Sequence, residues 1–234
     1  MKSLFITTCG RCGTRWVSKV VYQALDFKLQ LPCIYDLIDK GIVVTEYPRY
    51  IFLNERTSPG NYVYTWHTSL YHLRVISKYV NIAVLVRDLR DVCVSWNFFD
   101  IKNKKITEEQ FQDELISKLE KGGPSIEVID SYIELADEIN CQLIRFEDLI
   151  KDPFMGFSKL LNSFGYQYSE DNLVLAIKNN DFKTLSGGRE TGEQDVNNHY
   201  RKGIIGDWKN YLSESDNERF LSLHGDKMRF LGYA

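Results

Sequence analysis

A loop at residues 9–16 combines glycine with cationic and hydroxyl side chains. It follows an apolar segment at 3–9, which we predict to be a strand, and it precedes a stretch with helical periodicity at 14–25. Backbone N–H groups of such a turn and the N-terminus of the next helix together bind phosphate or sulfate. We therefore expect a phosphorylated or sulfated small molecule to contact this loop. The residues that it offers are Arg11, Cys12, Gly13, Thr14, Arg15 and Trp16.

The loop lacks one residue that defines the nucleoside triphosphate-binding Walker A motif. That motif reads G-x-x-x-x-G-K-[ST], with Lys directly after the last glycine. Here Gly13 is followed by Thr14. The sequence therefore favours an anion other than Mg-ATP.

A second cationic residue, Arg87, follows a predicted strand at 82–86. The carboxyl ends of parallel strands face one ligand crevice, so Arg87 should point to the same place as the first loop. Ser95 comes eight residues later, about two helical turns on, and could offer a hydroxyl to the same anion. The simpler alternative is a surface ion pair of Arg87 with Asp88 or Asp91.

A third segment contains Arg201 and Lys202, which are followed by Gly203. Adjacent Arg and Lys side chains on an adaptable backbone can grip a phosphate through charge-assisted hydrogen bonds. An isolated Arg-Lys pair more often lies on a solvated face of the protein. A phosphate-binding role for this pair therefore depends on the other two segments.

The elements that must position these residues are those of an α/β protein. Apolar runs alternate with segments of helical period, which is typical of a central parallel sheet flanked by helices in three layers, as in P-loop proteins. A polar, glycine-rich stretch at 186–195 predicts a mobile loop that could act as a lid. We predict strands at 3–9, 62–66, 82–86 and 142–146, with a weaker one near 42–45. We predict helices at 14–25, 69–79, 90–98, 108–121, 125–139, 154–164, 170–179 and 214–230.

Composition narrows the class of protein. The length of 234 residues predicts one domain over 1–234. The 29 Lys and Arg against 32 Asp and Glu leave a net charge of -3, so no overall positive field attracts nucleic acid or an anionic membrane. No stretch is apolar for long enough to span a bilayer. The odd number of five cysteines fits reduced thiols, which predicts a cytoplasmic protein.

Taken together, the three segments resemble the cofactor-binding elements of the sulfotransferases that use 3'-phosphoadenosine 5'-phosphosulfate. The first loop of the cytosolic members commonly reads P-K-S-G-T-T-W, and the second element is an Arg followed eight residues later by Ser. The third element, R-K-G-x-x-G-D-W-K-N, matches this chain at every specified position from Arg201 to Asn210. The resemblance extends from the first predicted strand to the last predicted helix.

The resemblance implies a role for each matching residue. The first loop would surround the 5'-phosphosulfate, and three aromatic side chains would lie near the adenine, although core packing is the commoner fate of such rings. The implied 5' contacts are Arg11, Cys12, Gly13, Thr14 and Arg15, the adenine contacts are Trp16, Phe146 and Phe182, and the 3'-phosphate contacts are Arg87, Ser95, Arg201, Lys202 and Gly203.

The implied reaction moves a sulfuryl group to a hydroxyl or amine of a small-molecule acceptor by in-line displacement, leaving adenosine 3',5'-bisphosphate. His67, at the end of the strand 62–66, matches the family's catalytic base, and His199 is its main rival. Arg11 stands where the family has Lys. Since Arg keeps its proton at ordinary pH, we expect it to act as an electrostatic stabiliser. This scheme needs no metal.

Two other functions stay open at this point. A P-loop small-molecule kinase would need a Mg-binding carboxylate, for which Glu147 and Asp148 are the nearest candidates. A non-catalytic nucleotide-binding module would keep the anion site but lack the base.

The sequence also contains a C-x-x-C pattern and part of the family's dimer pattern. The C-x-x-C at Cys9 and Cys12 lacks a thioredoxin-like or zinc-binding context, so we interpret Cys12 as a small loop residue. The family's dimer pattern has Ser213 and Glu214 in place of Thr-Val, which predicts a monomer or a weak dimer.

Overall fold

The computed structural model describes residues 2–30, 51, 62–66, 70–123 and 126–233. Within them, a five-stranded parallel sheet has the order β2-β3-β1-β4-β5. Its central strands β1 and β4 are buried at every residue except the half-buried Asn81, because both faces of the sheet are covered. The strands are β1 (Leu4–Thr8), β2 (Lys28–Gln30), β3 (Tyr62–Trp66), β4 (Asn81–Val86) and β5 (Cys141–Arg145).

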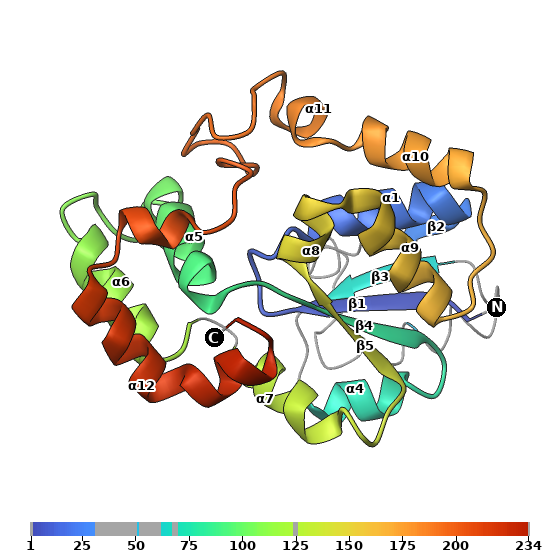
Figure 1. Ribbon diagram of the computed structural model, residues 1–234, viewed down its shortest axis with the longest axis horizontal. Helices are drawn as coiled ribbons and strands as arrows, with labels where there is room; N and C mark the ends of the chain where they lie inside the picture. The colour runs from blue at the N-terminus through green and yellow to red at the C-terminus, as the bar shows by residue number, and fades with distance from the viewer. Residues whose placement is uncertain (1, 31–50, 52–61, 67–69, 124–125, 234) are drawn as a thin grey trace.

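Helices cover both faces of this sheet and extend beyond one end of it. Figure 1 shows α1, α8, α9 and α10 on one side, α4 and α7 on the other, and α5, α6 and α12 beside the sheet. The helices are α1 (Thr14–Leu25), α4 (Leu70–Ile76), α5 (Leu89–Lys102), α6 (Phe111–Glu120), α7 (Ile126–Leu135), α8 (Phe146–Lys151), α9 (Pro153–Ser163), α10 (Glu170–Asn179), α11 (Phe182–Ser186) and α12 (Glu214–Phe230), with a 3-10 turn, η2, at Asp207–Asn210. The predicted three-layer α/β architecture is confirmed.

Most predicted elements are present, with different ends. The strand at 62–66 and the helices at 14–25, 170–179 and 214–230 agree exactly, whereas the predicted strand near 42–45 lies outside the described residues. The prediction that Phe146 ends a strand is wrong. Pairing with β4 stops at Arg145, which faces Val86, and Phe146 begins α8. The short elements β2, α8, α11 and η2 were not predicted, because three to six residues give too little periodicity.

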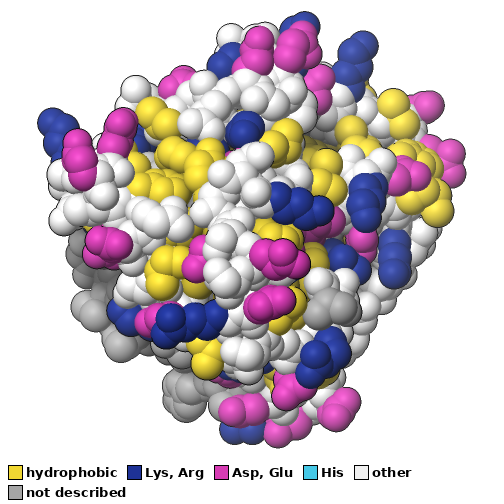
Figure 2. Space-filling model, turned by 60° about the vertical axis from the view of Figure 1, so that its left-hand side comes forward, with side chains coloured by type: hydrophobic (Ala, Val, Ile, Leu, Met, Phe, Trp, Pro, Cys, Tyr) yellow, Lys and Arg dark blue, Asp and Glu magenta, His cyan; other side chains and the backbone are white. Residues whose placement is uncertain are grey.

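No helix among the described residues is long and apolar enough to cross a membrane. Figure 2 shows one face of the molecule, on which cationic and acidic side chains are interspersed. This face therefore has no continuous positive patch that could attract an anion over a long range.

Candidate functional site

The first loop leaves β1 at the carboxyl edge of the sheet and turns sharply into α1. Gly10, Arg11 and Gly13 all have positive φ angles, of 85°, 54° and 82°. Gly13 is the N-cap of α1, and its carbonyl accepts the first helical hydrogen bonds from Trp16 and Val17. No acidic residue lies in the first turn of α1, so its positive dipole end is not neutralised. The left-handed turn and the free N-terminus of α1 are compatible with the predicted anion site, and anion binding itself stays a prediction.

Phe146 packs directly against this loop. A Cβ atom added to Gly13 would lie 2.7 Å from the Phe146 ring, so only glycine fits there. Trp16 meets the rings of Phe146 and Phe157 edge-on, at centroid distances of 5.9 and 5.5 Å, and only 8% of Trp16 is exposed. Trp16 and Phe146, two of the three predicted adenine contacts, are therefore core residues in this structure, as the packing alternative expects. Stacking on a base stays a prediction.

The Arg11 side chain reaches from the loop to α5. Its Nε donates to the Ser95 Oγ at 3.1 Å, and its guanidinium lies over the Phe99 ring at 5.0 Å. Burial lowers the pKa of Arg11 to about 10, and the neighbouring positive charges of Arg87 and Arg201 act in the same direction. Arg11 remains a cation at neutral pH, but it is held against like charges.

Arg87 follows β4 and lies beneath the first loop. It donates to the carbonyl oxygens of Arg11 at 3.3 Å and Ile204 at 2.8 Å, which joins the first and third segments. It also pairs with Asp91 at 3.3 Å, as the simpler alternative expected, but this pair is buried and not at the surface. Its guanidinium lies 4.8 Å from the centre of the Phe146 ring. Arg87 is therefore part of the interior of the site.

Asp91 connects α5 to the third segment. Its two carboxylate oxygens accept from the backbone N–H groups of Trp208 at 2.9 Å and Gly206 at 2.7 Å. Asp91 is 1% exposed. Sequence reasoning treated this residue only as a surface partner of Arg87. Its spacing of four residues from Arg87 on a helix was the available signal.

Asp207 holds both cations of the Arg201 and Lys202 pair. One of its oxygens binds Arg201, and the other binds Lys202 at 2.7 Å. Burial acts to raise the pKa of Asp207, but the hydrogen bonds from Lys202 and Arg201 outweigh it and keep the pKa below its ordinary value. Arg201 also donates to Gln194 at 2.8 Å. The sequence showed Asp207 within the third motif, but it indicated no role for it.

Gly203 lies against Phe182, the first residue of α11. A Cβ atom on Gly203 would come within 2.4 Å of the Phe182 ring, and its φ of 70° is left-handed. Phe182 therefore lies beside the third segment. Its contact with the adenine, which the resemblance implies, stays a prediction.

The glycine-rich stretch 186–195 runs beside this segment. Arg189 donates to the carbonyl oxygen of Arg201 at 2.8 Å, and the N–H of Gly192 donates to that of Lys202 at 2.9 Å. The stretch is thus bonded to the backbone of the cationic pair. Its mobility stays a prediction.

Of the two candidate bases, His67 lies outside the described residues. His199 lines a pocket with Arg11, Lys102 and Arg201. Burial, followed by the charges of Arg11, Arg15 and Lys102, lowers the pKa of His199 to about 3. An imidazole with this pKa is a weak base.

The Cys9 and Cys12 thiols are in contact inside the loop, with their sulfur atoms 3.1 Å apart and fully buried. The hydrogen bond to Cys12, followed by burial, raises the pKa of Cys9 well above its ordinary value. A buried thiol that resists ionisation is not a reactive thiolate. Both cysteines thus pack the loop, in line with the sequence interpretation.

The charged groups described so far leave an excess of positive charge. Arg11, Arg87, Arg201 and Lys202 are four cations, and the carboxylates of Asp91 and Asp207 neutralise two of them. Arg15 adds an exposed cation at the start of α1. A bound polyanion would relieve the repulsion among these groups.

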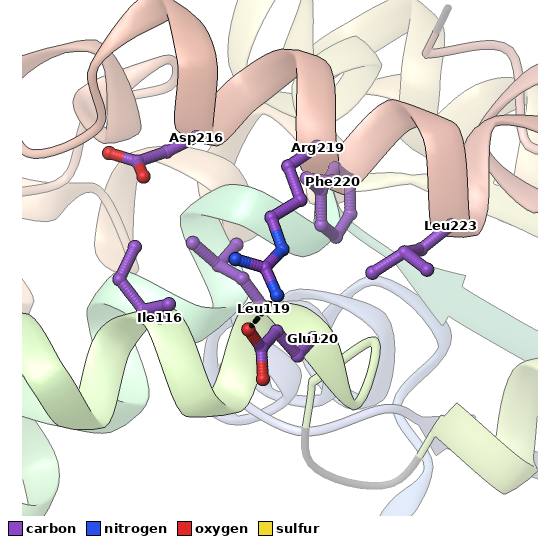
Figure 3. A pocket seen from close by; sticks show the side chains of 7 residues that line it. All are labelled: Ile116, Leu119, Glu120, Asp216, Arg219, Phe220 and Leu223. Atoms are coloured by element: carbon purple, nitrogen blue, oxygen red, sulfur yellow. Dashed lines mark ion pairs between the residues drawn. The ribbon is translucent and has the colours of Figure 1, made fainter.

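A second pocket lies between α6 and α12 and has a different character. Figure 3 shows the ion pair between Arg219 and Glu120, at 2.7 Å, across this pocket. Its lining has two acids and one cation, so it does not suit an anion. The lining residues are Ile116, Leu119, Glu120, Asp216, Arg219, Phe220 and Leu223.

Comparison with known proteins assigns the family. The model of the sulfotransferase domain matches residues 1–232. The chain belongs to the sulfotransferase family. Human sulfotransferase 2A1 is 24% identical over 243 residues, covering 97% of this chain and 84% of that protein. Mouse sulfotransferase 1E1 is also 24% identical, with 97% and 83% covered.

Solved structures show the same fold as this sulfotransferase. Mouse sulfotransferase SULT7A1, complexed with PAP, has a TM-score of 0.76 at 20% identity, covering 97% of this chain and 85% of that one. Retinol dehydratase, in complex with androsterone and inactive cofactor PAP, has a TM-score of 0.67 at 17% identity, covering 98% and 82%. The family and the fold expected from the three motifs are thus confirmed.

Proposed function

We propose that this sulfotransferase moves the sulfuryl group of 3'-phosphoadenosine 5'-phosphosulfate to a hydroxyl or amine of a small molecule. The observation that carries the proposal is the buried excess of positive charge where the three motif segments meet. Arg11, Arg87 and Arg201 come from three separate parts of the chain, and burial, followed by repulsion from Arg87 and Arg201, lowers the pKa of Arg11. Such an arrangement suits a ligand with more than one anionic group. The PAP bound in the related structures supports the same ligand.

The third segment and the start of α5 would hold the 3'-phosphate. Lys202 and Arg201 keep their orientation through Asp207, and Arg87 keeps its orientation through Asp91. Because these two carboxylates orient three cations without neutralising them all, the three cations need little reordering when they bind phosphate. Gly203 lets the backbone pass close to Phe182 at the same place.

The first loop and the N-terminus of α1 would face the 5' end. When bound, the donor supplies the sulfuryl group and leaves as adenosine 3',5'-bisphosphate. Arg11 remains charged and would stabilise negative charge that develops on the leaving group. To do so, it would exchange its hydrogen bond with Ser95 for one with the ligand. Thr14 and Arg15 at the head of α1 would add a hydroxyl and a further cation.

His67 would act as the base that takes the acceptor's proton. The topology supports this, because β3 ends at Trp66 in register with Thr7 of β1, directly before the first loop. The lowered pKa of His199 makes that residue the poorer candidate.

Replacing His67 with Ala tests this assignment. We expect transfer to fall by about 100- to 10,000-fold with bisphosphate affinity kept within about twofold, because a general base acts on the acceptor and not on the donor. Radiolabelled sulfate transfer and calorimetric titration measure the two quantities. Undiminished transfer by the variant would contradict the role of His67.

Replacing Arg201 and Lys202 together with Ala tests the 3'-phosphate site. Calorimetry should show adenosine 3',5'-bisphosphate binding weakened at least about 100-fold, because two charge-assisted hydrogen bonds are lost. Binding of adenosine 5'-phosphate, which lacks the 3' group, should change far less. Equal losses for both ligands would count against the site. Tighter binding of ADP with Mg²⁺ than of the bisphosphate by the unmodified protein would instead support a kinase.

A further inference from the structure

His199 occupies an unusual place beside the proposed cofactor site. Its pocket, between α5 and the segment 196–201, also contains the cationic side chains of Arg11, Lys102 and Arg201. Arg11 donates to the backbone oxygen of His199 at 3.5 Å. The imidazole is therefore held where positive charges converge, two residues before Arg201.

The imidazole has unused hydrogen-bonding capacity. Within the described part of the chain, its ring meets Tyr200 edge-on at 5.3 Å, and no hydrogen bond to either ring nitrogen is formed. The charged groups that face it are Arg11 and Arg15 from the first loop and α1, Lys102 from α5, and Arg201 from its own segment. All four are cations. Protonation of His199 is thus opposed from every side in the free protein.

A bound polyanion would favour protonation of His199. It would cancel the field of the cations and offer acceptor oxygens to the ring. We propose that His199 is a further binding residue for the bisphosphate, and that it takes up one proton from solvent when this anion binds. This inference rests on the proposed function. The protonated ring then has N–H donors for a phosphate oxygen, and it no longer has the free lone pair that a catalytic base requires.

Proton uptake can be counted by calorimetry. Adenosine 3',5'-bisphosphate is titrated into the protein at pH 6.5 in several non-phosphate buffers of different ionisation enthalpy. The same titrations are made with His199→Gln, so that the ligand's own protonation cancels in the difference. Free His199 is uncharged at this pH because its pKa is about 3. If the bound ring regains an ordinary pKa of about 6.5, the unmodified protein should take up about half a proton more than the variant.

The control is His224→Gln, because His224 lies on α12 and bonds to the carbonyl oxygens of Leu119 and Glu120. Its proton count should equal that of the unmodified protein. Equal counts for the unmodified protein and His199→Gln would overturn the inference while leaving the proposed function intact. No binding of the bisphosphate by the unmodified protein would overturn both.

A second measurement does not depend on any variant being folded. In proton NMR of the unmodified protein, one histidine resonance should not titrate between pH 5.5 and 8 until the bisphosphate is added. It should then titrate in this range. A resonance that stays insensitive to pH in the complex would contradict proton uptake by His199.

Discussion

Gly203 illustrates how one backbone conformation sets the position of the cationic pair. Its φ is 70°, and the Phe182 ring lies where a side chain would begin. Gly206 has nearly the same φ, 73°, but in the described part of the chain no residue beyond its two neighbours has an atom within 4 Å of its added Cβ. The two glycines therefore separate the cost of left-handed backbone from the cost of a steric clash.

We predict that Gly203→Ala destabilises the protein more than Gly206→Ala. The left-handed conformation should cost both variants about 1 to 2 kcal/mol of unfolding free energy, and the clash with Phe182 should cost Gly203→Ala a further ~2 kcal/mol. Urea denaturation measures the difference. A double-mutant cycle with Phe182→Ala should recover most of the additional loss. Equal losses for the two glycine variants would show that Phe182 does not limit this position.

Helix α5 is the element that brings the second and third segments together. It begins directly after Asp88, whose side chain caps it by accepting from the N–H of Arg90. One turn on, Asp91 binds Arg87 and two backbone N–H groups at 206–208. The next turn presents Ser95 to Arg11. One face of one helix thus aligns the three parts of the site.

Replacing Asp91 with Ala should therefore cost much more than an ordinary surface substitution. It leaves a buried guanidinium and two part-buried N–H groups without this partner, so we expect a loss of about 3 to 5 kcal/mol of unfolding free energy. The exposed Asp137→Ala should stay within about 0.5 kcal/mol. Urea denaturation of both variants gives the comparison. A loss at Asp91 as small as that at Asp137 would mean that the carboxylate does not hold the segments together.

At the scale of the whole molecule, the overall charge and the local charge have opposite signs. The chain carries a net charge of -3, while the site holds an excess of cations. Burial, and after it the cations of the site, depress the pKa of His199 in the folded protein only. In the unfolded chain, His199 has its ordinary pKa of 6.5 and is protonated below that pH. In the folded protein its pKa is about 3, so it stays neutral until the pH falls to about 3. His199 therefore lowers stability progressively as the pH falls below 6.5.

We predict that His199→Gln has a flatter dependence of stability on pH than the unmodified protein. Between pH 5 and 6.5, the unfolding free energy of the unmodified protein should fall more steeply on acidification, and above pH 7 the two dependences should run parallel. Urea denaturation at several pH values measures both curves. Parallel curves over the whole range would show that the pKa of His199 is the same in both states.

Much of the site was predictable from the sequence, because its signals are local. A strand, a glycine loop and a helix follow one another within residues 4–25, and Arg201, Lys202 and Gly203 are adjacent. What the sequence could not supply was the pairing of charges across the chain. Arg11 and Ser95 are 84 residues apart, and Asp91 meets Gly206 from 115 residues away. No spacing rule connects positions that only folding brings together.

By itself, the sequence determined the class of fold, the three cationic segments and the family to which they belong. Apolar periodicity, turn residues and motif order all act over short stretches, so they are readable without a structure. Only the tertiary structure decided that Trp16 and Phe146 are buried, that Asp207 binds both Arg201 and Lys202, and that the charged residues lining the pocket of His199 are cations. Burial and electrostatic environment depend on neighbours from every part of the chain, because charge and packing act through space.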